Sequence, residues 1–168
     1  SFPLESQSAI RNVMGNDPLI GCNVVDLTTN GILFNGVAPN TDLRGNKLNR
    51  HRWGLHLDAT AIIDAQDRKG NLWYQPPPSD GLGAWYEDSL NAVNNAFLVN
   101  PATVSGGNTM PPSVWPTSGW FESVGGTNYD CDNHHGVDYC SLFKQRDKEQ
   151  LTELDVKVAS DSLENDPY

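Results

Sequence analysis

The spacing of the cysteines most constrains how this chain can fold. Two of the chain's three cysteines, Cys131 and Cys140, bracket a short polar segment that holds two histidines and two carboxylates. Such a segment fits either a disulfide clip or the wall of a metal site. Because the spacing matches neither zinc-ribbon nor redox CxxC patterns, we expect a Cys131–Cys140 disulfide, with Cys22 left as a buried free thiol. A disulfide places the chain in an oxidising compartment.

The composition also favours an exported protein that is rich in loops and strands. Hydrophobic residues make up 38% and charged residues 19% of the 168 residues, with 15 Gly and 11 Pro. These values are typical of extracellular β-rich domains more than of helical cytosolic enzymes. No Asn-x-Ser/Thr glycosylation site occurs, which favours a bacterial or viral origin. We expect an extracellular or cell-surface location, with the periplasm as the alternative.

The net charge of −10 excludes one class of partner. Only 11 Lys and Arg stand against 21 Asp and Glu, so the chain lacks the excess of cations that a nucleic-acid binder needs. No stretch approaches the roughly 20 apolar residues of a membrane-spanning helix, and none is expected in this chain. The chain starts at Ser1 without a signal-like segment, which fits a mature or trimmed form.

Two helices are expected from the spacing of apolar residues. The first covers 4–14, ends at Gly15, and fits the end of a longer helix. The second covers 85–98, where Leu90, Val93 and Phe97 fall at helical spacing and should be buried.

The remaining patterns predict strands joined by hairpins. Alternating residues predict strands within 19–37 and 53–74, with His56 on the solvated polar face. A Gly- and Pro-rich loop is expected over 100–130, a last strand over 154–158, and an acidic frayed tail over 160–168. No internal repeat is apparent. We therefore predict one α+β domain over 1–168, built on an antiparallel sheet.

Carboxylates near the late cysteines form a candidate metal site. Hard oxygen ligands suit Ca²⁺, although the spacing does not follow the EF-hand pattern. The candidate ligands are Asp130, Asp132, Asp138 and His134. We expect no cofactor, with Ca²⁺ as the alternative. Zinc or copper on the histidines has less support, because adjacent His134 and His135 on a strand would point to opposite faces.

Aromatic residues in the 100–130 loop form a candidate binding surface. Trp115, Trp120 and Phe121 follow Pro- or Gly-containing turns and lie outside any periodic apolar pattern. Planar aromatic side chains stack on sugars and are frequent at binding hot spots. The alternative interpretation is that they fill the core beneath the loop.

Catalysis has weaker support in the sequence. We find no nucleophile elbow, phosphate-binding loop or dinucleotide fingerprint. Carboxylate pairs such as Glu87 with Asp88, or Glu122 with Asp130, leave a secreted hydrolase as the alternative, either metal-assisted or using a carboxylate or histidine site.

The expected element order is similar to that of the head domains of bacterial type IV pilins and pseudopilins: a helix, then a sheet, then a late disulfide loop. The resemblance covers element order alone, and the apolar, glutamate-bearing start of those proteins is absent here. It implies a subunit of a surface filament. We therefore expect a non-catalytic domain that acts in adhesion or surface assembly. Its partner would be a glycan, a receptor protein or further copies of itself.

Overall fold

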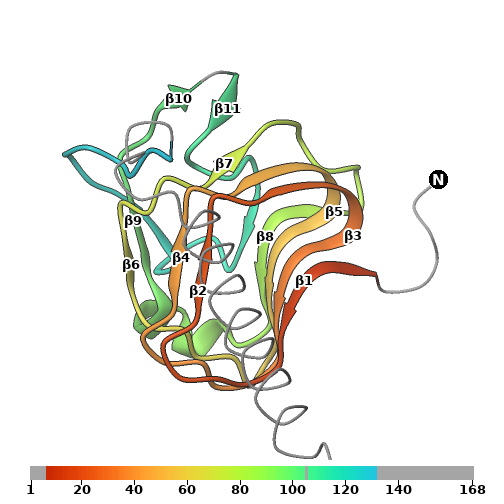
Figure 1. Ribbon diagram of the computed structural model, residues 1–168, viewed down its shortest axis with the longest axis vertical. Coiled ribbons are helices and arrows are strands. Elements are labelled where there is room, and N and C mark those ends of the chain that lie inside the picture. The colour runs from red at the N-terminus through yellow and green to blue at the C-terminus, as the bar shows by residue number, and fades with distance from the viewer. Residues whose placement is uncertain (1–6, 105, 132–168) are drawn as a thin grey trace, which may run out of the picture. The chain divides into compact units, whose positions relative to one another are not determined.

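Parallel pairing between segments one coil apart defines the fold. The computed structural model describes residues 7–104 and 106–131, all within one compact unit that ends at Cys131. Ile32 pairs in register with Ile10 on one side and Leu55 on the other, and Leu55 pairs in turn with Ala84. The chain therefore winds in successive coils, each adding a strand beside the last, in a β-solenoid-like arrangement (Figure 1).

The strands of the described residues form three sheets, and all pairs are parallel except β7–β11 and β10–β11. The main sheet has the order β1-β3-β5-β7-β11-β10, and β8 pairs with both β5 and β12. Its strands are β1 (Ser8–Asn12), β3 (Val24–Phe34), β5 (Lys47–Leu57), β7 (Leu72–Trp73), β8 (Leu82–Tyr86), β10 (Thr103–Val104), β11 (Gly107–Asn108) and β12 (Val114–Trp115). The second sheet joins β13 (Phe121–Ser123), β9 (Phe97–Val99) and β6 (Gln66–Asp67). The third pairs β2 (Leu19–Gly21) with β4 (Asp42–Arg44).

A short sequence motif recurs at equivalent positions of β3, β5 and β8. In each copy a glycine precedes two inward-facing apolar residues separated by one outward-facing residue, and a polar residue follows. The copies are Gly31-Ile32-Leu33-Phe34-Asn35, Gly54-Leu55-His56-Leu57-Asp58 and Gly83-Ala84-Trp85-Tyr86-Glu87. The chain thus contains an internal repeat, contrary to the sequence-based expectation.

The inward-facing residues of this motif stack into the core. The second apolar residues of the three copies, Phe34, Leu57 and Tyr86, are at most 1% exposed. The first apolar residues, Ile32, Leu55 and Ala84, are equally buried. Trp120 is fully buried and lies beside Tyr86, with ring centroids 5.6 Å apart. In-register stacking of apolar side chains along the coils therefore supplies the hydrophobic stabilisation of the fold.

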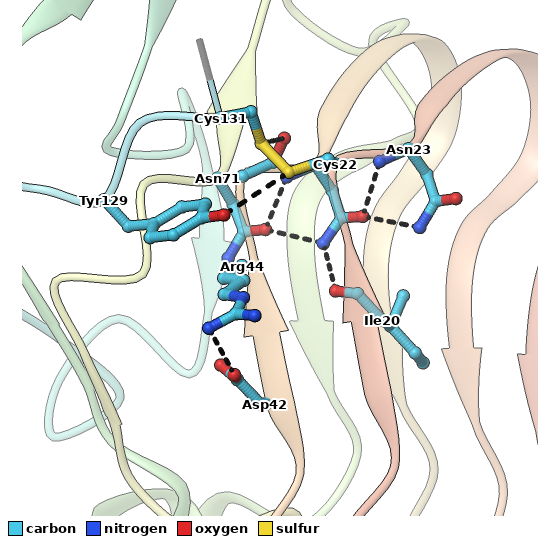
Figure 2. Close-up of a disulfide and its surroundings, with 10 residues drawn as sticks. Ile20, Cys22, Asn23, Asp42, Arg44, Asn71, Tyr129 and Cys131 are labelled. Atoms are coloured by element: carbon cyan, nitrogen blue, oxygen red, sulfur yellow. Dashed lines mark hydrogen bonds and ion pairs between the residues drawn. A yellow bond between two sulfur atoms is a disulfide. The ribbon is translucent and has the colours of Figure 1, made fainter. Parts of the chain in front are cut away.

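A column of asparagines marks one turn of the solenoid. Asn23 Nδ2 donates to Asn46 Oδ1 and Asn46 Nδ2 donates to Asn71 Oδ1, both at 2.9 Å. Each asparagine follows a residue with positive φ, namely Cys22 (55°), Gly45 (61°) or Gly70 (65°). The amides satisfy one another from coil to coil, which keeps buried polar groups bonded (Figure 2).

The α+β prediction with two helices and an antiparallel sheet is wrong. Residues 8–12, expected as helix, form β1, and the pairing in the main sheet is mostly parallel. The 85–98 segment divides into the end of β8, the short 3-10 helix η1 (Ser89–Asn95) and β9. Leu90 and Val93 are 90% and 63% exposed, so only Phe97 of the expected apolar stripe is buried. The helical spacing was coincidental, because Phe97 faces the core from β9 whereas Leu90 and Val93 lie exposed in η1.

The expected cysteine pairing is also corrected. Cys131 joins Cys22, with their Cα atoms 5.9 Å apart, so Cys22 is not a free thiol. The Tyr129 hydroxyl donates to Cys22 Sγ at 3.7 Å, and the Arg44 guanidinium carbon lies 5.0 Å from the centroid of the Tyr129 ring (Figure 2). The disulfide and the two Tyr129 contacts therefore hold this segment against the turns that contain Cys22 and Arg44. Cys140, the predicted strand 154–158 and the tail 160–168 lie outside the described residues.

A β-rich fold with a disulfide is confirmed. In the part of the chain that the structure describes, no helix is long and apolar enough to cross a membrane.

Candidate functional site

A cleft of about 430 Å³ opens on the outer face of β1, β3, β5 and β8. Because alternate side chains of a strand point to opposite faces, the residues between the buried core columns project into this cleft. The cleft combines aromatic, acidic, basic and amide groups. Its lining residues are Ser8, Arg11, Asn30, Leu33, Asn35, Trp53, His56, Asp58, Trp85 and Glu87.

His56 lines the cleft and is only 8% exposed. Its Nδ1 lies 2.8 Å from Asn30 Oδ1, and its Nε2 lies 2.9 Å from Glu87 Oε1. The second contact becomes an ion pair when the imidazole is protonated. Neighbours on the coils before and after it therefore fix both edges of the ring. Alternation correctly placed His56 on the outward face, but it is buried there and not solvated.

Two indoles border the imidazole. The Trp85 ring stacks on His56, with centroids 4.4 Å apart and planes inclined by 13°. Trp53 lies 4.9 Å from Trp85, and the Arg52 guanidinium covers part of Trp53 at 4.6 Å. Both indoles are half-buried. They are thus held rigidly while part of their apolar surface remains accessible to a ligand.

Asp58 is held as a carboxylate beside the aromatic residues. Its oxygens accept hydrogen bonds from Asn35 Nδ2 (2.9 Å), Gly36 N (3.3 Å), and Thr60 N and Oγ1 (both 2.8 Å). Burial raises the pKa of Asp58, and these hydrogen bonds lower it. The lowering is the larger of the two effects, so the pKa of Asp58 lies below its usual value. Asp58 is therefore an ionised acceptor at neutral pH.

Glu87 occupies the equivalent position on the next coil. Its backbone N–H donates to Leu57 O, as that of Asp58 donates to Phe34 O, which places the two carboxylates on neighbouring strands. Glu87 Oε2 accepts from Ala59 N at 3.3 Å while Oε1 contacts His56. All four carboxylate oxygens of the pair thus already have a partner. This arrangement suits hydrogen bonding to a ligand more than proton transfer.

The three aromatic residues expected to bind a ligand lie in different environments. Trp115 is 51% exposed and pairs in register with Trp85, so it extends the same face by one coil. Trp120 is fully buried, and Phe121 is half-buried and stacked on Phe97 at 4.6 Å. Trp120 therefore belongs to the core, as the alternative interpretation held. The repeated Gly-x-x-x-polar motif is the sequence signal that locates the cleft, and it was missed.

The metal-site prediction is not tested. Asp132, His134 and Asp138 lie outside the described residues, and Asp130 is described without them. Within 7–104 and 106–131, no group of three or more His, Cys, Asp or Glu side chains is placed to hold a metal ion.

Comparison with known proteins adds no family. No protein-family profile matches the sequence, and no curated protein or solved structure is significantly similar to it. A functional interpretation therefore rests on the geometry of the cleft.

Proposed function

We propose that this protein binds a glycan in the cleft over β1, β3, β5 and β8. The observation that carries the proposal is the pair of half-buried indoles, Trp53 and Trp85, set beside two fixed carboxylates. Aromatic rings offer an apolar surface to the C–H face of a sugar, and ionised carboxylates accept hydrogen bonds from its hydroxyls.

The size and charge of the cleft narrow the ligand class. A volume of about 430 Å³ accommodates a small molecule or a few units of a chain. Its lining holds two carboxylates, Asp58 and Glu87, and one guanidinium, that of Arg11, so negative charge exceeds positive charge among these groups. Like charges repel in a partly desolvated site, which favours a neutral, hydroxyl-rich sugar over a uronic acid or sulfated sugar.

The disulfide supports an exported location for this activity. Disulfides persist in oxidising compartments and are rare in the cytosol. A cell surface or extracellular setting also offers glycans as partners. The element order behind the filament-subunit hypothesis was a helix, a sheet and a late disulfide loop. Two of these supports are lost, because residues 8–12 form a strand and Cys131 joins Cys22.

Hydrolysis of the bound glycan is the competing function. Two carboxylates on neighbouring coils are the groups that glycoside hydrolysis uses. The hydrogen bonds that occupy all four of their oxygens favour recognition over catalysis. Binding and hydrolysis are distinguished by incubating the protein with glycans and assaying for new reducing ends. We expect no new reducing ends to form.

The proposal is tested by binding measurements on the whole chain. A panel of neutral oligosaccharides with α- and β-linkages is screened, and the affinities of those that bind are measured by calorimetry. Trp85→Ala should weaken binding at least tenfold because the stacking surface is lost. Leu90→Ala serves as the control, since Leu90 is exposed and lies outside the cleft. A chain that binds no sugar of the panel, or a Trp85→Ala variant with unchanged affinity, overturns the proposal.

A further inference from the structure

We infer that the ligand is a linear, extended oligosaccharide that lies across the strands, along the direction in which the coils stack, and that Trp115 forms an additional subsite. This inference rests on the proposed glycan-binding function. It specifies the shape of the ligand and assigns a role to a residue outside the cleft itself.

The first support is a continuous column of outward-facing residues. Leu33 pairs in register with His56, His56 with Trp85, and Trp85 with Trp115. In-register residues of neighbouring strands project from the same face of a sheet. The column therefore places one ring on each of three successive coils, β5, β8 and β12.

A second, polar column runs beside the first. Asn35, Asp58 and Glu87 follow the same register, two residues further along each strand. From β3 to β8, each coil thus presents an oxygen acceptor at the same offset from the first column. Two parallel rows of repeating groups match a ligand that itself repeats along their length.

The spacing of the coils sets the repeat. Neighbouring strands lie about 4.8 Å apart in the hydrogen-bonding direction. This distance is close to the advance per sugar in an extended chain of β-1,4-linked pyranoses. A chain laid along the columns would therefore pass a ring on β5, β8 and β12 and an oxygen acceptor beside β3, β5 and β8, one strand for each unit.

Trp115 is positioned to take the unit beyond Trp85. It is 51% exposed, so part of its indole surface is accessible to a ligand. His56 already covers one face of Trp85. A sugar bound toward β12 would contact Trp115 without disturbing the His56–Trp85 stack.

The test measures affinity as a function of chain length on the whole protein. The probes are linear β-1,4-linked oligosaccharides of glucose, mannose and N-acetylglucosamine with two to six units. Cyclic and linear α-1,4-glucans of similar size serve as probes that do not extend. We expect affinity for a β-1,4 series to rise at least tenfold from two units to about four and then to level off, because the columns end.

Trp115→Ala separates the additional subsite from the rest of the cleft. It should leave the affinity for the two-unit probe within twofold of the wild type while lowering that for four units at least tenfold. Trp85→Ala should weaken both, and Leu90→Ala neither. Melting temperatures verify that each variant is folded, which is expected for Trp115→Ala because the side chain is exposed.

The outcomes distinguish the two proposals. If no probe binds the wild type, glycan binding itself fails. If only α-linked or cyclic probes bind, or if Trp115→Ala changes no affinity or changes all of them equally, the axial arrangement is overturned while glycan binding stands.

Discussion

An ideal β-carbon built on Gly54 would lie 2.4 Å from the carbonyl oxygen of Gly83, one coil further along the solenoid. The same relationship joins Gly31 to Gly54, also at 2.4 Å. Backbone from the next coil thus occupies the space that a side chain would need. Gly54→Ala should therefore destabilise the fold by about 1–3 kcal/mol, the usual cost of overpacking, as measured by chemical denaturation.

Gly125→Ala is the matched control for this substitution. Apart from Gly125 itself and its two chain neighbours, no atom of the described residues lies within 4 Å of its ideal β-carbon, and its φ is not in the left-handed region. The free energy of unfolding should stay unchanged or rise slightly, because alanine restricts the unfolded chain. Equal losses in both variants would show that close packing of the glycine column is not the cause.

This glycine column also explains why the coil repeat escaped sequence analysis. Gly54 follows Gly31 by 23 residues, but Gly83 follows Gly54 by 29. Four of the six extra residues lie in the proline-rich connection between β7 and β8, because Asn46 precedes Gly54 by 8 residues whereas Asn71 precedes Gly83 by 12. The coil lengthens there without disturbing strand register. A search for a fixed period therefore fails, even though the motif around each glycine is similar.

The site was predictable only in part, for a related reason. Local alternation placed His56 outward. The irregular surroundings of Trp115 and Trp120 suggested two exposed indoles, but only Trp115 is exposed and Trp120 is fully buried. Asn30 and Glu87 contact the two ring nitrogens of His56, and both come from other coils. Spacing within one strand carries no information about which side chains lie beside it on the next coil.

His51 should make stability depend on pH. It is fully buried, and within the described residues neither ring nitrogen has a hydrogen-bond partner. Burial lowers the pKa of His51 to about 4, from 6.5. Between these values the unfolded chain binds the proton and the folded chain does not, so stability falls as the pH falls. From pH 8 to pH 5 the loss should be about 2 kcal/mol.

The measurement is a denaturation series across this range on the wild type and His51→Leu. The leucine variant cannot be protonated there, so its stability should vary less with pH, whatever its absolute value. The pKa of Asp58 is lowered from its usual value of 3.8, so the stability that Asp58 contributes is lost as the pH falls through and below that value. This loss lies outside the range from pH 8 to pH 5. Identical pH profiles for the two proteins would contradict a buried neutral His51.

The Cys22–Cys131 bond should be the strongest single constraint on the fold. The two residues lie 109 positions apart, and closing so long a loop removes much of the entropy of the unfolded chain. Replacing both cysteines with serine should lower the free energy of unfolding by up to roughly 5 kcal/mol in the chain-entropy model.

The pairing itself is checked by digesting the non-reduced protein with a protease that cleaves before aspartate. Because Asp132 and Asp138 separate Cys131 from Cys140, mass spectrometry should find residues 17–25 linked to 130–131. A linkage of Cys131 to Cys140 with Cys22 alkylated would contradict the pairing in the structure.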